Sequence, residues 1–560
     1  MATLTPELAF QLALGHRQMG RLAEAEALLR QIVAVQPNHV SAWHQFGLVV
    51  LQLGRPGEAV DLIRKAVALQ PGNAALHSDL GVAYRMRGDL EEAIASFRDA
   101  LRLHPAVGHT HRNLGDALLA AGRSEEAIAS YRSAIAAQPA DAGAHNNLGN
   151  VYLHLGQLED AAACYQRAVD LEPRLIQAQS NLGDMLTKLD RPEEGLACAH
   201  RVLALDPNFA DGHLNMGVAY WRMGRFAEAE ACYRRAIALK PDLVDAHLNL
   251  GLLLLLHRRY EEGWREYEWH WRSGTHASRR RDLAAPTWDG TPAEGKTILT
   301  YCDQGFGDTL QFVRYLPLVL EQSRAARLIV ECQAALIPLL RQLGGPQIEF
   351  VPRDESRETS PPHDLHVSFF DFPLVLGRFE PLTTPEPYLK ADEEKRMAWR
   401  SRLGPAGRKR VGIAWAGNPA QRDDRRRSMK PEMLGPVLAV PGITFVNLQF
   451  QPAGPLPAPI ADAGVLDVRE HIADFADSAA LLAELDLIIT VDTSVAHLAG
   501  ALGRPAWVMV SFVPDFRWGI GHTDTPWYPS MRLFRQPCAG DWETVVQEVT
   551  TALQMAKAGG

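Results

Sequence analysis

An aspartate in a glycine turn is the residue of this sequence best suited to acid–base chemistry. The string Gln304-Gly-Phe-Gly-Asp308 follows an expected strand and precedes an expected helix. A helix dipole favours an ionised carboxylate at the helix N-terminus, and an ionised carboxylate can act as a general base. Asp308 is therefore a candidate catalytic base, and simple helix capping is the alternative that this position allows. The turn is not a dinucleotide-binding fingerprint, because Leu310 stands where the third glycine would be.

A second motif offers a binding site for phosphate. A buried strand is expected to end at Asp492, and a helix is expected to start at Thr493 or Ser494. The first backbone N–H groups of a helix have no partner within it, so together with two hydroxyl groups they can bind an anion. A pyrophosphate would fit at this helix end.

A third motif combines a strand end with positive charge. The expected strand 411–415 ends at Trp415 and leads into Gly417 and Asn418, and a basic segment with Arg427 and Lys430 follows at residues 421–430. Guanidinium and ammonium groups can neutralise phosphates. Taken alone, such a run of charge is more often a solvated loop.

These motifs require parallel sheets that bring the strand ends together. Strands and helices alternate in two series, which we interpret as two lobes, residues 296–405 and 406–560. The expected strands are 297–302, 327–331, 348–351, 365–369, 411–415, 444–448, 487–491, 506–510 and 532–534, and the expected helices are 309–322, 333–343, 475–485 and 494–502. This alternation predicts mainly parallel sheets with ligands at the carboxyl ends of the strands. Two such Rossmann-like lobes with a cleft between them resemble the GT-B architecture.

The first half of the chain has a period of 34 residues. Three series keep this spacing: a proline after each unit, a glycine within the first helix and a glycine at the turn between helices. Their members are Pro37, Pro71, Pro105, Pro139, Pro173, Pro207 and Pro241; Gly47, Gly81, Gly115, Gly149, Gly183, Gly217 and Gly251; and Gly20, Gly54, Gly88, Gly122, Gly156 and Gly224, with Asp190 and Arg258 interrupting the third series.

Each series has a physical reason. A glycine within the first helix allows the second helix to approach closely, a glycine at the turn relieves backbone strain, and a proline stops the second helix. The phased series resemble the tetratricopeptide-repeat family over about residues 6–257, with seven full units and the first helix of an eighth. We therefore expect residues 1–257 to form an α-solenoid, a tetratricopeptide superhelix.

One polar position of the repeat is a candidate for holding a partner. Asparagine occupies it in five units: Asn113, Asn147, Asn181, Asn215 and Asn249. A carboxamide both donates and accepts hydrogen bonds, so it can hold a peptide backbone without reading its side chains. The O-linked N-acetylglucosamine transferases have a similar asparagine ladder, and this resemblance implies a protein acceptor in the groove. A hydrogen bond between helices within the stack is the alternative.

Two other repeated positions are interpreted as structural. One slot holds Trp43 in an early unit and histidine in five others, and a small-residue slot holds three cysteines; the residues are His77, His111, His145, His213 and His247, and Cys164, Cys198 and Cys232. One histidine per repeat places the five rings apart along a solenoid, so a metal site is not expected there. The cysteines are expected in the core.

Residues 258–295 are expected to join the two halves. An aromatic stripe lies at helical spacing on one face, formed by Tyr260, Trp264, Tyr267 and Trp271. It predicts a capping helix that packs against the next domain. A polar linker with three arginines, residues 279–281, follows.

The motifs of the second half together resemble the glycosyltransferase family that contains the ADP-heptose:lipopolysaccharide heptosyltransferases, over about residues 296–555. They are similar in particular to a bacterial subgroup that carries this domain behind tetratricopeptide repeats. The strings that carry the resemblance are residues 304–315, 491–500 and 527–535.

This resemblance implies roles for individual residues. Asp308 corresponds to the base that is proposed for the family. Asp492, Thr493 and Ser494 correspond to contacts with the donor sugar and its phosphates, and Arg427 or Lys430 to the contact with the pyrophosphate. We assign other residues of the three motifs to the donor site as well: Gly305, Gly307, Trp415, Asn418 and His497.

The sequence therefore predicts an inverting, metal-independent glycosyltransferase that moves a sugar from a nucleotide sugar to a hydroxyl group of a protein held by the repeats. No D-x-D metal motif accompanies the cleft motifs, so no metal or other cofactor is expected, and the nucleotide sugar is a substrate. Two alternatives stand beside this prediction: a non-catalytic scaffold with a degenerate transferase domain, and a heptosyltransferase that acts on a lipid-linked glycan.

Composition limits the remaining classes. The chain of 560 residues is 47% hydrophobic and 22% charged with a net charge of −9, which gives no electrostatic case for nucleic-acid binding. No apolar run approaches the about 18 residues of a membrane span, and no basic segment followed by an apolar core suggests a secretory signal. Six cysteines without a C-x-x-C pair fit a reducing cytoplasm. A homo-oligomer formed through the solenoid ends is compatible with the sequence.

Overall fold

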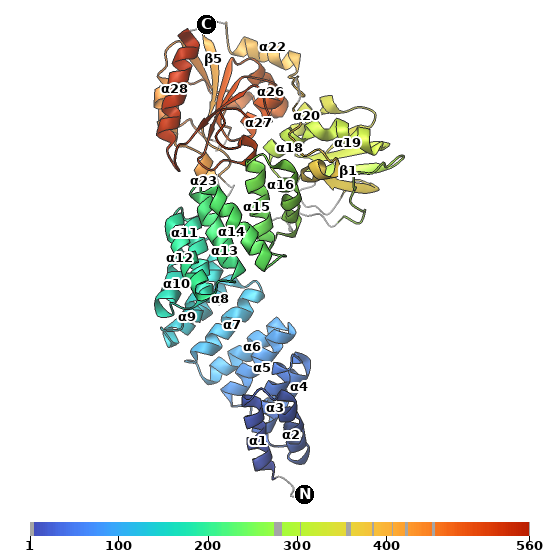
Figure 1. Cartoon of the computed structure of the whole chain (residues 1–560), viewed down its shortest axis with the longest axis vertical. Coiled ribbons are helices and arrows are strands. Elements are labelled where there is room, and N and C mark those ends of the chain that lie inside the picture. Colours follow the sequence, from blue (N-terminus) through green and yellow to red (C-terminus); the bar gives the residue numbers. More distant parts are fainter. Residues whose placement is uncertain are drawn as a thin grey trace. The chain divides into compact units, whose positions relative to one another are not determined.

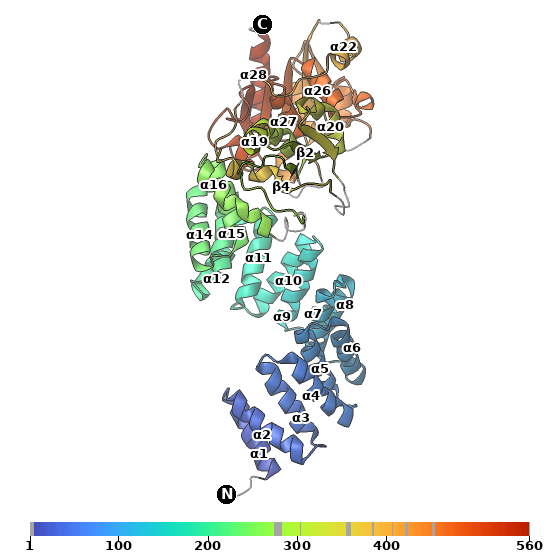
Figure 2. The ribbon, with the colours of Figure 1, turned by 90° about the vertical axis from the view of Figure 1, so that its right-hand side faces the viewer.

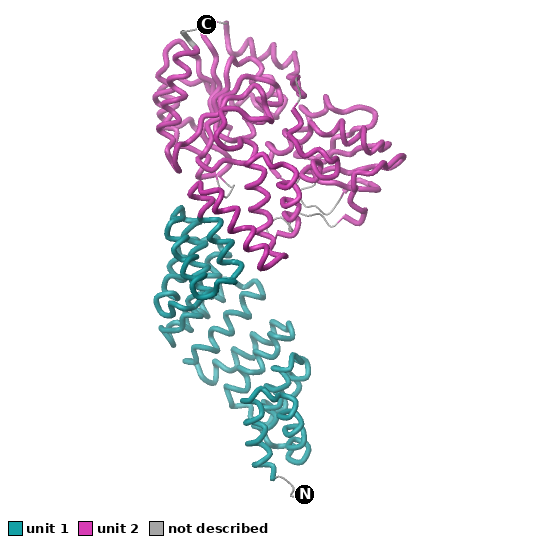
Figure 3. The backbone as a smooth tube through the Cα atoms, viewed as in Figure 1, with its two compact units in different colours: residues 1–219 teal, residues 220–560 magenta. Residues whose placement is uncertain are grey.

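The computed structural model of this chain describes residues 5–273, 283–302, 304–353, 360–383, 386–405, 407–419, 424–450 and 454–558. The linker arginines 279–281 and residues 421–423 of the basic segment lie outside these ranges. The chain forms two compact units, Met1–Ala219 and Tyr220–Gly560 (Figure 3). Our domain limits 1–257, 258–295, 296–405 and 406–560 describe sequence segments and stay predictions. No helix within the described ranges is long and apolar enough to cross a membrane.

The first unit is a series of helix pairs, in which consecutive helices lie side by side in both views (Figures 1 and 2). Its helices are α1 (Pro6–Gln18), α2 (Leu22–Val35), α3 (Val40–Gln52), α4 (Pro56–Leu69), α5 (Ala74–Arg87), α6 (Leu90–Leu103), α7 (Gly108–Ala120), α8 (Ser124–Ala137), α9 (Ala142–His154), α10 (Leu158–Leu171), α11 (Ile176–Lys188) and α12 (Pro192–Leu205). The series continues along the chain with α13 (Ala210–Arg222), α14 (Phe226–Leu239), α15 (Val244–Leu256) and α16 (Tyr260–Tyr267).

Glycines set both the spacing and the turns of these pairs. A Cβ atom at Gly115 of α7 would lie 2.7 Å from Cε1 of Tyr131 in α8, closer than atoms can pack. The prediction that this glycine series permits close helix approach is therefore confirmed. The turn glycines are left-handed, with φ of 74° at Gly122. Asp190 and Arg258, which interrupt that series, keep the same conformation with φ of 61° and 60°, so these two turns carry backbone strain that glycine would relieve.

The second unit contains two parallel sheets. The first has the order β3-β2-β1-β4, and the second has the order β6-β5-β7-β8-β9. Their strands are β1 (Thr297–Tyr301), β2 (Arg327–Cys332), β3 (Ile348–Pro352), β4 (Leu365–Ser368), β5 (Lys409–Ala414), β6 (Ile443–Asn447), β7 (Leu487–Val491), β8 (Ala506–Val510) and β9 (Met531–Arg535). All nine expected strands are present, with ends within two residues of the predicted ones, and the prediction of parallel α/β structure is confirmed.

Helices cover both faces of the second sheet, because successive side chains of a strand point to opposite faces. On one face Ile413 and Ile489 pack with residues of α28 (Trp542–Ala558) such as Val545. On the other face Ile488 and Val508 pack with α26 (Phe475–Ala483) and α27 (Ser494–Ala501). Figure 1 shows α28 on the side of the sheet opposite to α26 and α27.

Two expected helices of the first lobe are broken into short pieces. Residues 309–322 form α18 (Phe306–Phe312), a 3₁₀ turn at 313–315 and α19 (Leu316–Ser323), and residues 333–343 form α20 (Ile337–Leu340) between two 3₁₀ turns. Pro317 and Pro338 lie at the first positions of α19 and α20. Proline has no N–H group to donate to the preceding turn and its ring clashes there, so a new helix begins at each proline.

Shorter helices complete the second unit. They are α21 (Phe372–Val375), α22 (Glu393–Arg402), α23 (Asp424–Arg427), α24 (Gly435–Leu438) and α25 (Ala458–Asp462).

The aromatic stripe of α16 joins the core of the second unit. Trp264 is fully buried, its ring meets Phe312 and Phe516 edge-on at centroid distances of 6.2 and 5.6 Å, and its Nε1–H donates to the Phe379 carbonyl at 3.1 Å. Phe312 comes from the first lobe and Phe516 from the second. The prediction that this helix packs against the next domain is confirmed, and it contacts both lobes.

Candidate functional site

The carboxyl ends of the two sheets share one cleft in the second unit. Its volume is about 780 Å³. Its wall includes residues that follow eight different strands, β1 to β8 in order: Gly305, Gln333, Arg353, Phe370, Gly417, Gln449, Asp492 and Asp515. Parallel sheets bind ligands at this end of their strands. The cleft therefore lies where the alternation of strands and helices predicted a ligand.

Asp308 lies in this cleft and has two partners. Its Oδ2 accepts a hydrogen bond from the Gly305 N–H at 2.9 Å, which caps α18. Its Oδ1 forms an ion pair with Arg517. Burial raises the pKa of Asp308 above its ordinary value, and the Arg517 guanidinium opposes that shift. The carboxylate is thus both a helix cap and one member of an ion pair in the cleft.

Sequence reasoning missed Asp515 and Arg517, which lie in the loop after β8. Arg517 is only 6% exposed; its Nη1 donates to Asp515 Oδ1 at 2.9 Å, and its Nε donates to the Gln311 side chain. Burial lowers the pKa of this guanidinium, but Asp515, Asp308 and Asp492 outweigh burial and raise it. An Asp-x-Arg pair five residues after the end of the strand 506–510 is the signal that could have revealed both residues.

Asp492 follows β7 and has a strongly shifted pKa. Burial raises the pKa of Asp492 to about 6, with a further increase from the Asp515 carboxylate and an opposing effect of Arg427. The next residue, Thr493, caps α27 by accepting a hydrogen bond from the Val495 N–H at 3.3 Å. Asp492, Thr493 and Ser494 all line the cleft, so the helix end that we assigned to phosphate opens into it.

Gly307 and His497 bring the two lobes into contact. A Cβ atom at Gly307 would lie 3.1 Å from His497 Nε2 and nearer still to Cδ2, so only glycine lets α18 pack on α27 here. The His497 ring is 5% exposed, and its Nδ1 is hydrogen-bonded to the Tyr528 hydroxyl at 2.8 Å. Burial lowers the pKa of His497 well below its ordinary value, and Arg517 adds to this effect. A neutral histidine therefore supports the floor of the cleft, which both residues line.

The third motif folds back on itself beside the cleft. Arg427 forms an ion pair with Asp424 at 3.0 Å. The Ser428 hydroxyl donates to Asp424 at 2.9 Å and accepts from the Gly417 N–H at 2.9 Å. These bonds hold the loop after β5 against the basic segment, and Gly417, Asn418 and Arg427 line the cleft.

Two residues that we assigned to the donor site lie away from the cleft wall. Trp415 is 5% exposed and follows Val411 and Ile413 into the apolar cluster on the α28 face of the sheet. Strand alternation explains this placement, because every second side chain points to the same face. Lys430 is exposed at the start of a 3₁₀ turn and is not among the residues that line the cleft.

The last repeat also contributes to the cleft wall, although no sequence motif indicates this. Leu252 of α15 and Tyr267 of α16 line the cleft. Asn249, the last member of the asparagine series, lies three residues before Leu252 on α15, so both side chains lie on one face of this helix. The Tyr267 pKa is raised by burial and by the Asp308 carboxylate.

The asparagine series forms hydrogen bonds within the helix stack. Asn147 Nδ2 donates to Asp116 at 3.0 Å. Asn181 Nδ2 donates to Asn150 at 3.3 Å, and Asn215 Nδ2 donates to the Ser180 hydroxyl at 2.9 Å. All five asparagines of the series are half-buried. The helix-to-helix alternative is therefore observed for three of them, and peptide binding by the series stays a prediction.

The repeated histidines have a structural role. In each of the five units the ring Nε2 is hydrogen-bonded to the carbonyl oxygen of the proline six residues earlier, at 2.7 Å for His111 and at 2.8, 3.3, 3.0 and 2.9 Å for His77, His145, His213 and His247. Trp43 Nε1–H makes the same bond to Pro37 at 2.7 Å. The slot therefore requires an N–H donor at the junction between repeats, and the structural interpretation is confirmed.

The described ranges contain no cluster of side chains that is suited to a metal ion. No group of three or more histidine, cysteine, aspartate or glutamate side chains there is placed to hold a metal ion. Cys198 is buried, and Cys164 and Cys232 are half-buried in the second helices of their pairs.

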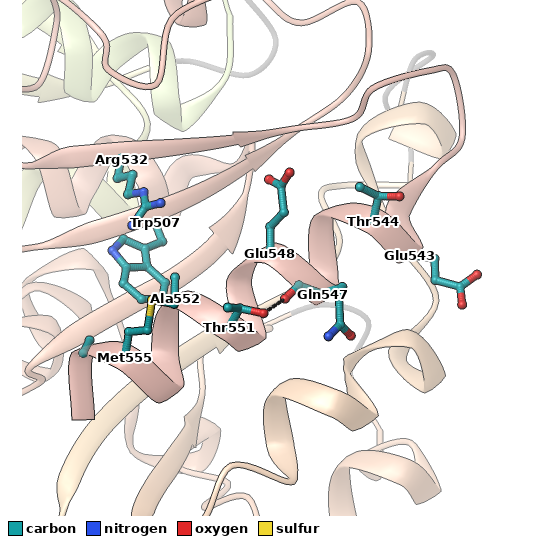
Figure 4. A pocket seen from close by; sticks show the side chains of 10 residues that line it. Trp507, Arg532, Glu543, Thr544, Gln547, Glu548, Thr551, Ala552 and Met555 are labelled. Atoms are coloured by element: carbon teal, nitrogen blue, oxygen red, sulfur yellow. Dashed lines mark hydrogen bonds between the residues drawn. The ribbon is translucent and has the colours of Figure 1, made fainter. Parts of the chain in front are cut away.

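A second hollow, of about 950 Å³, is lined by α28 together with Trp507 of β8 and Arg532 of β9. Figure 4 shows Trp507 beside Arg532 and Met555 at one end of this hollow, and Glu543, Thr544 and Gln547 at the other. It is open to solvent and contains none of the motif residues. The residues that could perform chemistry are gathered in the cleft instead.

Comparisons with known proteins concern mainly the repeats. Profiles of the tetratricopeptide repeat match residues 10–74, 44–107, 112–175 and 210–243. The chain is similar to Protein FlbA of Caulobacter vibrioides, with 29% identity over 330 residues and 54% of each chain covered. It thus spans about half the length of this curated relative.

Among solved structures, the chain is similar to YrrB, described as a TPR protein with an unusual peptide-binding site, with 25% identity, a TM-score of 0.30, and 33% of this chain and 95% of YrrB covered. It is also similar to MamA of Desulfovibrio magneticus RS-1, with 26% identity, a TM-score of 0.28, and coverage of 30% and 96%. The profile matches and the repeated helix pairs together show that the N-terminal part of this chain, to about residue 260, is a solenoid of tetratricopeptide repeats.

Proposed function

We propose that this protein is an inverting glycosyltransferase with the GT-B architecture, which transfers a sugar from a nucleoside-diphosphate sugar to a hydroxyl group of a protein. The observation that carries the proposal is the meeting of Asp308 and the Asp492-Thr493-Ser494 helix end in one cleft, at the facing carboxyl ends of two parallel sheets. Asp308 would supply a base, and the helix end at Asp492-Thr493-Ser494 would supply a site for phosphate. We place the reaction in the cytoplasm, which suits six cysteines without a disulfide among the described residues.

In the proposed reaction, Asp308 accepts the proton of the acceptor hydroxyl. The hydroxyl oxygen forms a bond to the anomeric carbon, and the bond from that carbon to the phosphate oxygen breaks. The electron pair of the broken bond leaves with the nucleoside diphosphate. Attack in line with the leaving group inverts the anomeric configuration. General-base catalysis of this kind contributes about 10²- to 10⁴-fold to a rate.

The leaving diphosphate gains negative charge, and the second lobe offers it positive charge. The first N–H groups of α27 and the Ser494 hydroxyl can donate to its oxygens. The Arg427 guanidinium lies on the same wall of the cleft. Donors held in place before the reaction stabilise the departing charge without reorganising.

The sugar itself would lie near Asp492 and Asp515. A sugar that leaves a phosphate develops positive charge at its anomeric carbon. Asp492, Asp515 and Asp308 provide three carboxylates, and the guanidinium groups of Arg517 and Arg427 offset their charge only in part, so this end of the cleft is acidic. Such a field favours the charge that develops on the sugar.

A protein is the acceptor that fits the placement of the last repeat. Leu252 and Tyr267 form part of the cleft wall, and Asn249 lies on the same face of α15 as Leu252. An extended acceptor segment that crosses Asn249 and Leu252 would bring a serine or threonine hydroxyl to Asp308. Tetratricopeptide repeats commonly bind polypeptides, which makes this solenoid the natural holder of such a segment.

A thermal-shift screen of the full chain with nucleoside diphosphates and their sugars tests the donor site. A ligand present at a hundred times its Kd stabilises the protein by about 2.7 kcal/mol. Transfer to candidate acceptors is then followed by intact mass spectrometry. Asp308→Asn should lower transfer at least about 100-fold, whereas Asp541→Asn, which retains a side-chain cap ahead of α28 outside the cleft, should not. Undiminished turnover of Asp308→Asn would refute the assignment.

A non-catalytic scaffold is the second candidate function. It is favoured by the bonding of Asp308, because both carboxylate oxygens already have partners within the protein. If the protein is a scaffold, the wild type and Asp308→Asn should bind partner proteins equally well. It would produce no mass increase on any partner with any nucleotide sugar.

A further inference from the structure

We propose that Arg517 is the positioning residue of this site: it holds the Asp308 carboxylate in the orientation and ionised state in which that group can accept a proton. The proposal rests on the proposed function for its catalytic consequence. Its structural basis, a guanidinium that joins two carboxylates across the two lobes, stands independently.

The geometry fixes Arg517 in a single position. Its Nη2 pairs with Asp308, its Nη1 donates to Asp515 at 2.9 Å, and its Nε donates to Gln311. Asp308 and Gln311 belong to α18 of the first lobe, whereas Asp515 belongs to the second lobe. A planar guanidinium whose five N–H groups form a rigid fork can hold such partners together, and a lysine ammonium cannot do so with the same directionality.

The loop that carries Arg517 is itself fixed from both sides. Phe516 packs edge-on against Trp264 of α16 at 5.6 Å. Arg535 of β9 donates to the Gly519 carbonyl at 3.0 Å and to the Trp518 carbonyl. The guanidinium therefore has a rigid support, and its position does not depend on Asp308 alone.

The ion pair of Arg517 and Asp308 forms a charge centre, and the charged groups that face it come from several elements. Asp308 of α18 faces Arg517 and Asp515 after β8 and the Tyr267 hydroxyl of α16. Asp492 after β7 faces the same Asp515, together with Arg517 and Arg427 of α23.

His497 of α27 also lies beside this centre and contributes no charge, because burial keeps it neutral. Asp308 and Asp515 thus share the Arg517 guanidinium, and Asp492 lies close enough to feel its charge. Removal of Arg517 would leave them to repel one another, and like charges in one site drive at least one carboxylate to take up a proton.

The consequence for catalysis is a shift in pH dependence. A base must be deprotonated to act, so kcat/KM falls as the pH drops through the pKa of the base. A neighbouring opposite charge lowers the pKa of a carboxyl by about 1–3 units. Without Arg517 the acidic limb of the profile should therefore move up by about 1–3 pH units. A role in packing alone would lower activity at every pH and leave the limb in place.

The experiment compares Arg517→Met and Arg517→Lys with the wild type in full-length protein. The pH profile of kcat/KM is measured with whichever nucleotide sugar supports transfer. Arg517→Met should show the shifted limb and recover part of its activity at high pH. Arg517→Lys keeps the charge, so it should shift the limb less. An unshifted limb in Arg517→Met would overturn the proposal.

A second measurement does not need the proposed reaction. Removing Arg517 raises the folded-state pKa values of Asp308 and Asp492 further above their unfolded values, so the folded protein holds more protons and loses stability as the pH rises. The unfolding midpoint of Arg517→Met, compared with that of the wild type, should therefore be lower at pH 8 than at pH 5. Adding Asp308→Asn should restore part of that loss. Arg410→Met, which removes a buried guanidinium bonded to the Gly404 carbonyl outside the cleft, should show no such dependence on pH.

The two measurements separate the two proposals. If Arg517→Met loses stability with rising pH and Asp308→Asn rescues it, while no donor or acceptor is found, the charge centre stands and the glycosyltransferase assignment fails. If Arg517→Met and Arg410→Met respond alike to pH, the role of Arg517 fails whatever the protein catalyses.

Discussion

Asp492 should destabilise the protein at neutral pH, so Asp492→Asn is expected to stabilise it. Burial raises the pKa of Asp492 from 3.8 to about 6 in the folded protein. A carboxyl with a raised folded-state pKa binds more protons folded than unfolded, so stability falls as the pH rises through this window. The loss of stability that ionised Asp492 causes is complete above about pH 6 and vanishes below about pH 4. Asparagine has nearly the same shape and cannot ionise.

The magnitude follows from the shift. One pKa unit corresponds to about 1.4 kcal/mol, so a shift of about two units corresponds to about 3 kcal/mol at pH 8. At pH 5 the folded Asp492 is already mostly protonated, and the same relation leaves about half of that gain. Asp492→Asn should therefore raise the free energy of unfolding by about 3 kcal/mol at pH 8 and by about half as much at pH 5.

Tryptophan fluorescence during urea unfolding is the assay, because Trp43 is the only one of the 12 tryptophans before residue 220. The signal therefore reports on the second unit, even if the two units unfold separately. Asp541→Asn, which changes an aspartate whose pKa is lowered by its hydrogen bonds to Thr544, is the matched control and should not gain stability at pH 8. A gain for Asp492→Asn that is absent, or equal at pH 5 and pH 8, would refute the reasoning.

Three further predictions concern the packing of the repeats and of the cap. Gly115→Ala should destabilise the first unit by about 1–3 kcal/mol, because its Cβ would overlap the Tyr131 ring; far-UV circular dichroism during unfolding measures this, and an unchanged midpoint would contradict it. His111→Ala should cost about 1 kcal/mol in the same assay through loss of the 2.7 Å bond to the Pro105 carbonyl. Trp264→Ala should lower the free energy of unfolding of the second unit by about 3–5 kcal/mol, which appears as a fluorescence transition at lower urea. A loss below about 1 kcal/mol would show that helix α16 contributes little to this unit.

The sequence specified the repeats almost completely. Their period, turns and close helix contacts depend on residues at fixed spacing within one unit, such as Gly115 and Tyr131, so local pattern is sufficient. The strands of the second unit were also predictable, because a buried parallel strand is a short continuous apolar run. The broken helices at Pro317 and Pro338 could have been foreseen from proline alone.

The candidate site was predictable only in part. Asp308, Asp492 and Arg427 each stand in a recognisable motif at the end of a strand, and all three line the cleft. Trp415 stands in the same kind of motif, but the alternation of its strand turns its side chain into the core. The asparagine series was open to two interpretations, since a carboxamide suits both helix stacking and peptide binding equally.

What the sequence by itself determined is the chemistry available to this protein: a repeating helical hairpin, two series of parallel strands and the polar groups at their ends. Only the tertiary structure decided which of those groups meet. Arg517 pairs with Asp308, although 209 positions separate them along the chain, and Leu252 of the last repeat joins the same wall. The reason is physical: motif and period record contacts between neighbours in sequence, whereas an ion pair across two lobes depends on how separate sheets pack.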